Sequence, residues 1–274
     1  MIRNVLSIAG SDPSGGAGIQ ADIKAISANG AYAMAVITAL TAQNTRGVSA
    51  VELVPPDFVA AQIDAVFDDI RVDAVKIGML GSGPIAEAVA DALARHGAGN
   101  IVLDPVMVAK GGDRLLSDAA VAVLVERLLP LADVLTPNLP EAAAMLGVTD
   151  PGDRDAMVEI AERLRALGPR NVLLKGGHLQ GTDSPDYLCT TTDGHWLEGG
   201  RVATRNTHGT GCTLSSALAA QLAITGDPLQ AARGAKAYVA VAIAHADELS
   251  VGFGHGPTHH FHAFWRQVAT SNAS

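Results

Sequence analysis

Short apolar runs alternate along the chain with longer segments in which apolar residues recur every three or four positions. Runs of the first kind are typical of strands buried in a parallel sheet, and segments of the second kind are typical of helices that cover such a sheet. The apolar runs predict strands at 4–9, 31–40, 73–80, 100–107, 133–138 and 171–177. The periodic segments predict helices at 18–29, 56–69, 84–97, 117–129, 139–147, 155–168, 211–224 and 228–249, with Ser117 as a candidate N-cap.

The pattern changes at 187–205, where polar and apolar residues alternate and Thr-Asp-Gly marks a turn. This change predicts antiparallel strands at one edge of the sheet. The fold class is therefore expected to be α/β, with a mostly parallel central sheet, helices on both faces and a short antiparallel edge. Because the sequence has no linker-like or low-complexity tract, residues 1–274 are expected to form one domain.

Composition and charge exclude several classes of function. The net charge is −9 and the Lys and Arg residues are scattered, which argues against a nucleic-acid surface or an anionic membrane face. Two cysteines cannot form a disulfide framework for a chain of 274 residues. The N-terminus lacks a signal-peptide layout, and charges interrupt the apolar runs before ~18 residues, so we expect a cytoplasmic protein without a transmembrane helix.

Polar residues and glycines gather where the predicted strands end. In a doubly wound sheet, ligands bind beyond the carboxyl ends of the strands. The sequence therefore predicts one site at this edge of the sheet. The candidates are Gly10–Asp12, Gln43–Asn44, Gly78–Met79, Asp104–Met107, Asn138 and Lys175–His178.

A glycine-rich stretch at 9–22, AGSDPSGGAGIQAD, follows the first predicted strand. It is no P-loop, because Gly16 and Ala17 stand where that motif needs Lys and Ser/Thr. Residues 16–21 fit the dinucleotide fingerprint, but the acid that binds the NAD ribose is missing at 41–44. Because carboxylates repel phosphate, Asp12 and Asp22 favour a pocket for a neutral substrate. The alternative is a tight strand-to-helix turn that Asp12 caps.

A second loop of small residues, NTHGTGCTLSSALAA at 206–220, runs into a predicted helix. The backbone amides of 209–212 and the helix dipole behind them would form an anion hole, to which Thr210 and Thr213 add hydroxyls. At the start of that helix the pKa of Cys212 is expected to fall, so that the thiolate can take a proton from a substrate hydroxyl. The alternative for Cys212 is an inert residue packed in the turn, which is the expected state of Cys189.

Eight motifs together carry a resemblance to a known family. They are AGSDPSGGAGIQAD (9–22), ITALTAQNTRGV (37–48), KIGML (76–80), LDPVM (103–107), TPNLPEA (136–142), LLKGGH (173–178), NTHGTGCTLSSALAA (206–220) and GHGPTHHFH (254–262). The chain resembles the hydroxymethylpyrimidine/phosphomethylpyrimidine kinases of thiamine biosynthesis, in the ribokinase-like superfamily. The resemblance implies ATP-dependent phosphorylation of 4-amino-5-hydroxymethyl-2-methylpyrimidine and then of its monophosphate, with Mg²⁺, in a homodimer.

The resemblance also implies roles for single residues. Cys212 matches the position of the catalytic base, and Gly209, Thr210 and Gly211 belong to the anion hole beside it. Gln43 matches the glutamine that binds the pyrimidine through its amide. Asp22 is implied to be a partner of the aminopyrimidine. Gly10, Met79 and Val106 complete the substrate pocket.

The remaining implied roles concern ATP and magnesium. Asn138 and Glu141 match an N-x-x-E signature that organises Mg²⁺ and its waters, and Asp104 is expected near ATP or the metal. Lys175 suits a phosphate, and His208 lines the phosphate loop. The alternatives are a helix-dipole role for Glu141, a turn acid at Asp104 and a surface lysine at Lys175. The tail histidines (255, 259, 260 and 262) are expected to pack and hydrogen-bond rather than hold a metal.

Two rival functions remain at this point. A pyridoxal kinase of the same superfamily shares the anion hole and the magnesium signature, but the Gln-Asn-Thr stretch at 43–45 and the double-glycine opening favour the pyrimidine. A non-catalytic pyrimidine-binding module is disfavoured, because the base and the phosphate loop are both present. Residues 105–114 have the glycines for a lid over the site.

Overall fold

The computed structural model describes residues 1–107, 118–149 and 152–265. Their central sheet has the strand order β10-β9-β8-β7-β6-β5-β1-β2. Six strands are parallel, and β9 and β10 are antiparallel at one edge, which confirms the predicted fold class. The strands are β1 (Asn4–Ala9), β2 (Tyr32–Ile37), β5 (Ala74–Ile77), β6 (Ile101–Leu103), β7 (Val134–Leu135), β8 (Asn171–Lys175), β9 (Asp186–Cys189) and β10 (Gly194–Leu197).

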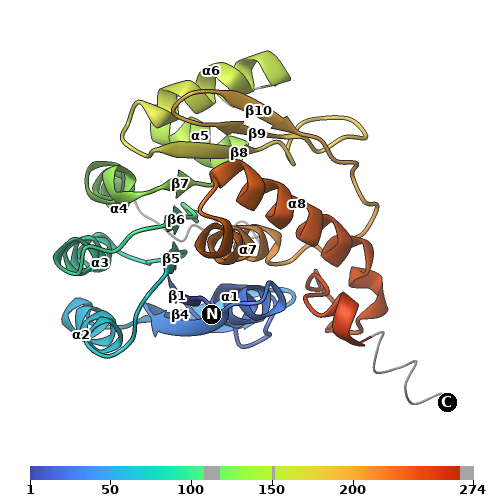
Figure 1. The fold of residues 1–274 in the computed structure, drawn as a ribbon. Helices are drawn as coiled ribbons and strands as arrows, with labels where there is room; N and C mark the ends of the chain where they lie inside the picture. Colours follow the sequence, from blue (N-terminus) through green and yellow to red (C-terminus); the bar gives the residue numbers. More distant parts are fainter. Residues whose placement is uncertain (108–117, 150–151, 266–274) are drawn as a thin grey trace.

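Helices cover both faces of the sheet (Figure 1). One face packs against α2 (Pro56–Phe67), α3 (Gly83–Arg95), α4 (Asp118–Val123), α5 (Leu139–Leu146) and α6 (Arg154–Arg165). The other face packs against α1 (Gly18–Ala28), α7 (Thr210–Thr225) and α8 (Pro228–Ala244). Helix α7 is buried along most of its length between the sheet, α1 and α8. Its small residues allow this close packing. Because the helix is buried on nearly all sides, its apolar positions do not form a single stripe.

The main difference from the prediction concerns 31–40, which is not one strand. Strand β2 ends at Ile37, and Thr38 turns the chain away by donating its hydroxyl to the carbonyl of Met79 at 2.7 Å. The chain then forms a separate antiparallel hairpin of β3 (Ala39–Asn44) and β4 (Gly47–Leu53). This hairpin stands at the carboxyl end of the sheet and so becomes a wall of the site.

Smaller differences affect the ends of other elements. The predicted strands at 100–107 and 133–138 shorten to β6 and β7. The predicted helix 117–129 is α4 followed by a π-helical turn, η1 (Leu124–Leu128), and a 3₁₀ turn, η2 (Leu129–Leu131). The last helix ends at Ala244 before a 3₁₀ turn, η3 (Ala246–Glu248). Ser117 and most of the predicted lid lie outside the described residues.

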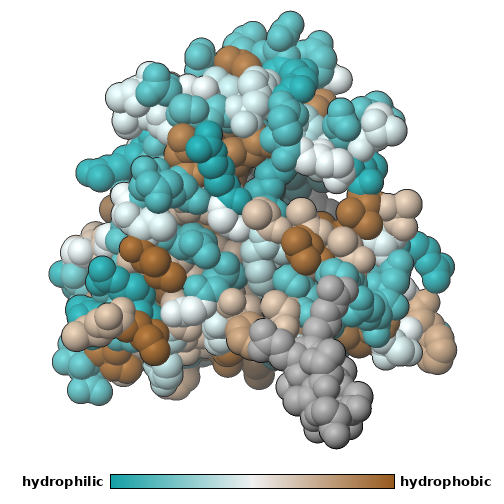
Figure 2. Space-filling model, turned by 45° about the vertical axis from the view of Figure 1, so that its right-hand side comes forward, coloured by the Kyte–Doolittle hydropathy of each residue, from teal (hydrophilic) through white to brown (hydrophobic). Residues whose placement is uncertain are grey.

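The surface is mixed in character. On the face drawn in Figure 2, hydrophilic residues predominate and apolar side chains appear singly or in small groups between them. Among the described residues, no helix has the length and apolar character that crossing a bilayer requires.

Candidate active site

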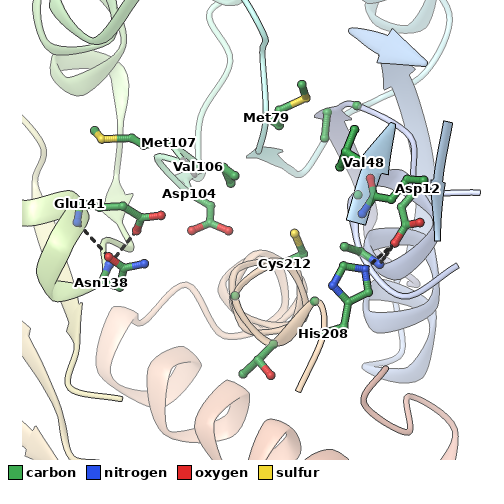
Figure 3. A pocket seen from close by; sticks show the side chains of 18 of the residues that line it. Asp12, Val48, Met79, Asp104, Val106, Met107, Asn138, Glu141, His208 and Cys212 are labelled. Carbon is green, nitrogen blue, oxygen red and sulfur yellow. Dashed lines mark hydrogen bonds and ion pairs between the residues drawn. The ribbon is translucent and has the colours of Figure 1, made fainter. Parts of the chain in front are cut away.

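A cavity of about 720 Å³ lies at the carboxyl ends of the parallel strands, between the β3–β4 hairpin and the start of α7 (Figure 3). Of the residues that were given a role in the site, Asp22 and Thr213 do not line it, and the others do: Gly10, Gln43, Met79, Asp104, Val106, Asn138, Glu141, Lys175, His208, Gly209, Thr210, Gly211 and Cys212. It also includes Asp12, Met107 and His178, which were predicted candidates at the strand ends, and Thr41, Val48 and Lys76, to which the prediction gave no role at the site. The topology therefore brings residues from both ends of the chain to one place.

The two glycine-rich loops touch through their backbones, which explains why both are rich in glycine. Gly209 has a φ of +74°, and a Cβ atom there would overlap the carbonyl oxygen of Gly16. A Cβ on Gly16 would in turn lie 2.5 Å from Cδ2 of His208. A side chain at Gly209 would have to displace the backbone of Gly16, and a side chain at Gly16 would have to displace the ring of His208.

Asp12 holds the first loop together. Its carboxylate accepts hydrogen bonds from the amides of Ser14 at 2.9 Å and Ala17 at 2.8 Å, and lies 2.8 Å from Nε2 of His208. Burial raises the pKa of Asp12, but the hydrogen bonds from His208 and Ser14 and the charge of His208 outweigh it and keep this pKa below its usual value. Asp12 thus caps the turn, as the alternative interpretation held, while the loop also lines the cavity.

The second loop forms the start of α7, with Gly209 at the N-cap position. A Cβ on Gly211 would lie 3.5 Å from Nζ of Lys175 and 3.7 Å from Oδ2 of Asp104, so the helix start faces a cation and a carboxylate. The first-turn amides and the helix dipole suit an anion bound beside Lys175. The predicted contribution of Thr213 is wrong, because its hydroxyl is buried and donates to the carbonyl of Gly209 at 2.8 Å.

Cys212 lies in the middle of the cavity, between the carboxylates on one side and the hairpin on the other (Figure 3). The backbone amide of Gly18, at the start of α1, acts on the sulfur and lowers its pKa. The predicted fall in its pKa is wrong. Burial raises the pKa of Cys212 to about 11, although the nearby ammonium of Lys76 acts in the opposite direction. The sulfur therefore carries its proton at neutral pH.

The acidic end of the cavity contains Asp104, Glu141 and Lys175. Nζ of Lys175 lies 3.0 Å from Oδ1 of Asp104 and 3.9 Å from Oε2 of Glu141. Burial raises the pKa of Asp104, but Lys175 and Lys76 lower it to below its usual value. Burial and the charge of Asp104 raise the pKa of Glu141 to about 7, against the opposing effect of Lys175. Lys175 is thus an internal cation rather than a surface lysine.

Asn138 and Glu141 form a capping box at the start of α5. The amide of Glu141 donates to Oδ1 of Asn138, and the amide of Asn138 donates to Oε2 of Glu141, both at 2.8 Å. The carboxyl group of Glu141 also faces that of Asp104 across the cavity (Figure 3). The helix-terminal role and the site role of Glu141 therefore coexist.

The opposite end of the cavity is largely apolar. Met79 follows β5 and Val106 follows β6, while Gln43 and Val48 come from the hairpin. A Cβ on Gly10 would lie 2.7 Å from Sδ of Met79, so this glycine makes room for the methionine. The hydroxyl of Thr41 donates to the carbonyl of Ser11 at 2.9 Å and lies 3.2 Å from Oε1 of Gln43. Val48 was missed because the hairpin was missed, although its alternating sequence at 47–53 was a signal for a strand.

Asp22 does not line the cavity, so the expected contact with the ring has no support in the structure. Its side chain is fully buried behind the wall of the site. The carboxylate accepts hydrogen bonds from Ser7 at 2.6 Å and Ser216 at 2.8 Å and forms an ion pair with Lys76 at 2.8 Å. The sequence pointed to Asp22 as functional, but the partner that explains its position is Lys76.

The tail histidines pack against the back of the second loop. The amide of His208 donates to the carbonyl of Gly256 at 3.0 Å, and Nε2 of His260 lies 3.1 Å from the hydroxyl of Thr213. His259 and His260 are both buried. His259 and His260 thus pack and form hydrogen bonds, as predicted.

Solved structures define the class of the protein. A Bacillus subtilis pyridoxal kinase in complex with ADP is 36% identical, with a TM-score of 0.88 over 95% of this chain and 98% of that one. A Staphylococcus aureus pyridoxal kinase in complex with AMP-PCP and pyridoxal is 30% identical, with a TM-score of 0.87 over 96% of both chains. The fold is that of a ribokinase-like small-molecule kinase.

The family follows from the sequence comparisons. Residues 12–259 match the family model described as phosphomethylpyrimidine kinase, and the chain belongs to this family of phosphotransferases. The hydroxymethylpyrimidine/phosphomethylpyrimidine kinase of Escherichia coli strain K12 is 54% identical over 96% of this chain and 98% of that protein. The protein of the same name from Rhizobium meliloti strain 1021 is also 54% identical, over 97% of this chain and 100% of that protein.

Proposed function

We propose that this kinase phosphorylates 4-amino-5-hydroxymethyl-2-methylpyrimidine and then the resulting monophosphate, using ATP. The observation that carries the proposal is the order of groups within one cavity. An apolar end with the Gln43 amide suits an aminopyrimidine ring, and an end with helix amides and Lys175 suits phosphates. Cys212 lies between the two ends, where a hydroxymethyl group of the ring would meet the terminal phosphate (Figure 3).

The chemistry that these residues can perform is phosphoryl transfer with a positioned base. The thiol of Cys212 first loses its own proton to water, and the resulting thiolate then accepts the proton of the substrate hydroxyl. The hydroxyl oxygen then forms a bond to the γ-phosphorus of ATP while the bond between that phosphorus and the departing ADP oxygen breaks. The amides of 209–212 and the ammonium of Lys175 stabilise the negative charge on the phosphoryl oxygens.

We also propose that Mg²⁺ accompanies ATP at the acidic end of the cavity. Carboxylate oxygens are ligands that Mg²⁺ prefers, and Glu141 and Asp104 supply them. Among the described residues, no group of three or more His, Cys, Asp or Glu side chains is arranged to hold a metal ion. The donor set therefore fits an ion that takes its other ligands from waters and from ATP phosphates. When bound, Mg²⁺ would neutralise phosphate charge.

A homodimer is a further proposal, which the resemblance implies. The β3–β4 hairpin supports it, because Leu40, Val51 and Leu53 expose 53%, 42% and 41% of their surface to solvent. Apolar side chains grouped on one hairpin are typical of an interface. Light scattering on the purified protein would then give twice the chain mass of 28.0 kDa. A mass of one chain at micromolar concentration would contradict this proposal.

One experiment tests the substrate assignment. The purified protein is incubated with Mg·ATP and either the hydroxymethylpyrimidine or pyridoxal, and products are identified by mass spectrometry. Formation of the pyrimidine monophosphate followed by the diphosphate is the expected result. Both solved structures described above are pyridoxal kinases, so pyridoxal is the informative competitor. Phosphorylation of pyridoxal alone would overturn the assignment and leave the kinase fold intact.

A further inference from the structure

The register of β1 and β5 places a hydroxyl and an ammonium group in the same buried layer between the sheet and helices α1 and α7. Ser7 in β1 and Lys76 in β5 lie opposite each other across the parallel pair. Their neighbours Val5 and Ala74, two residues earlier in each strand, pack in the core cluster with α1 and α7. Because side chains alternate along a strand, Ser7 and Lys76 point into this layer too. Both are 0% exposed.

The ammonium of Lys76 has a fixed partner in that layer. Both carboxylate oxygens of Asp22 accept from Nζ of Lys76, at 2.9 and 2.8 Å. Ser7 and Ser216 donate their hydroxyls to the same carboxylate. A buried ion pair costs desolvation energy that apolar residues of similar size would avoid, so stability alone does not account for it. Its position in the fold suggests another role.

That position is directly behind the sulfur of Cys212. Ser216, which binds Asp22, stands one helical turn after Cys212 on α7. Asp22 stands one turn after Gly18 on α1, and Gly18 and Cys212 line the same cavity. Lys76 itself forms part of the cavity that Cys212 lines. Two helices thus place the Lys76–Asp22 pair against the inner side of the thiol.

Four charged groups act on Cys212 from the elements around it. Lys76 from β5 and Lys175 from β8 are cations, while Asp22 from α1 and Asp104 after β6 are anions. The carboxylate of Asp104 forms an ion pair with Lys175 at 3.0 Å, and the carboxylate of Asp22 forms an ion pair with Lys76. Of these four groups Lys76 is the strongest influence on the thiol, and it favours the thiolate.

We propose that Lys76 is a positioning residue for phosphoryl transfer: its buried ammonium, held by Asp22, is the fixed positive charge that stabilises the Cys212 thiolate. This inference rests on the proposed function, in which that thiolate accepts the hydroxyl proton. An ammonium has three donors, and the pairing with Asp22 leaves capacity to interact with a negative sulfur. Because Lys76 is buried, its charge is poorly screened by solvent and needs no rearrangement during the reaction.

The test measures the thiolate directly rather than through activity. Alkylation of Cys212 by iodoacetamide is followed against pH, with each cysteine-containing peptide quantified by mass spectrometry. Cys189, the second cysteine of the chain, is an internal control in every sample. The variants are Lys76→Met, Asp22→Asn and the double variant Lys76→Met/Asp22→Asn. Ser216→Ala is the matched control, because it removes a hydrogen bond to Asp22 without changing any charge.

The single variants are expected to change the Cys212 profile in opposite directions. Lys76→Met should raise the midpoint by about one pH unit or more, which slows alkylation below the midpoint about tenfold. Asp22→Asn should lower the midpoint, since it leaves the Lys76 charge uncompensated. Ser216→Ala should leave the midpoint where it is in the unchanged protein. Cys189 should react alike in all samples.

The double variant keeps the test decisive if Lys76→Met fails to fold, because it leaves no unpaired buried carboxylate. The double variant should still raise the midpoint of Cys212 alkylation, because the charge of Lys76 affects the thiol more strongly than the opposing charge of Asp22. Folded variants that all alkylate like the unchanged protein would overturn the proposal and make Lys76 purely structural. Equal slowing by Lys76→Met and Asp22→Asn would also overturn it, because altered packing rather than charge would then be the cause.

Kinetics provide the second measurement. Lys76→Met, or the double variant, should lower kcat about tenfold or more while the KM for ATP stays within about twofold. An unchanged kcat would contradict the proposal. If the unchanged protein fails to phosphorylate the pyrimidine, the proposed function fails, but the alkylation profile still decides whether Lys76 stabilises the thiolate.

Discussion

His208 and Asp12 join the two glycine-rich loops, with Nε2 of His208 2.8 Å from Oδ2 of Asp12 across 196 positions of sequence. Both side chains are buried, and the carboxylate also organises the turn between β1 and α1. This one contact thus aligns the loop beside the apolar end of the cavity with the loop that carries the helix amides. The two loops are therefore held in a fixed position relative to each other by the contact between His208 and Asp12.

The close contact between the two loops leads to a first prediction, for Gly209→Ala. A methyl group at Gly209 would overlap the carbonyl of Gly16, and φ of +74° is unfavourable for alanine. We expect a loss of about 2 kcal/mol or more in the free energy of unfolding, and a strong loss of activity. Urea denaturation followed by circular dichroism measures the first effect.

Gly226→Ala is the matched control for this prediction. Gly226 ends the same helix with φ of +67°, but a Cβ there meets no atom within 4 Å. Gly226→Ala should therefore lower the free energy of unfolding only by the backbone strain, about 1 kcal/mol, and the variant should retain its activity. Equal losses for Gly226→Ala and Gly209→Ala would show that strain, and not the contact between the loops, limits Gly209.

A second prediction concerns the role of Cys212. Cys212→Ser replaces the thiol by a hydroxyl of much higher pKa, so kcat should fall on the order of a hundredfold or more. The KM for ATP should change little, because the helix amides remain. Steady-state kinetics measure both constants. Cys189→Ser, in the buried β9, should leave kcat unaffected, and a Cys212→Ser enzyme with normal turnover would remove Cys212 from the role of base.

The amide of Gln43 supports a third prediction. Gln43→Ala removes a donor and an acceptor from the apolar end of the cavity, and the KM for the pyrimidine should rise about tenfold. The kcat should change less, because the group lies away from the transferred phosphate. Asn44→Ala on the same hairpin is the control, since Asn44 is exposed and outside the cavity. Equal KM values for the two variants would count against a contact between Gln43 and the ring.

Parts of the site could be predicted from the sequence because they depend on local patterns. Residues at the ends of parallel strands must meet at one edge of the sheet, so Asp104, Asn138 and Lys175 could be grouped from the strand pattern alone. The capping box of Glu141 is likewise a local signal.

The parts that failed depend on contacts between distant segments. Thr38 interrupts an apolar run, but only its hydrogen bond to the carbonyl of Met79 shows that the chain leaves the sheet there. Asp22 was expected at the substrate, and only the packing of α1 on β5 reveals Lys76 as its partner. The pKa of Cys212 was expected to fall from its place on a helix, whereas burial, which no local pattern encodes, raises it.

A fourth prediction concerns Glu141 and the divalent cation. Full activity should require Mg²⁺ and disappear in excess chelator. Glu141→Gln preserves the capping box, because a glutamine side chain also accepts from the amide of Asn138. The variant should remain folded but need about tenfold more Mg²⁺ for half-maximal activity, since one anionic ligand is lost. Glu87→Gln, at an exposed position on α3, is the control for the lost charge. An unaltered Mg²⁺ requirement in Glu141→Gln would place the ion elsewhere.

The last prediction follows from the buried ring of His260. Burial, together with the charges of Lys24 and His259, lowers the pKa of His260 from 6.5 to about 3. Below pH 6.5 the unfolded chain binds a proton at His260 that the folded protein does not bind. The free energy of unfolding is therefore highest above pH 6.5 and decreases as the pH falls toward 3. Between pH 7 and 5 the loss amounts to about 2 kcal/mol.

His260→Gln removes this titration while keeping a polar group near Thr213. The variant should be less stable than the unchanged protein at pH 7, and the difference should shrink by about 2 kcal/mol at pH 5. Urea denaturation at a series of pH values measures the difference, in which the titration of all other groups cancels. His255→Gln is the control, since His255 is already exposed in the folded protein. A difference between His260→Gln and the unchanged protein that stays constant with pH would mean that the buried ring can hold a proton without loss of stability.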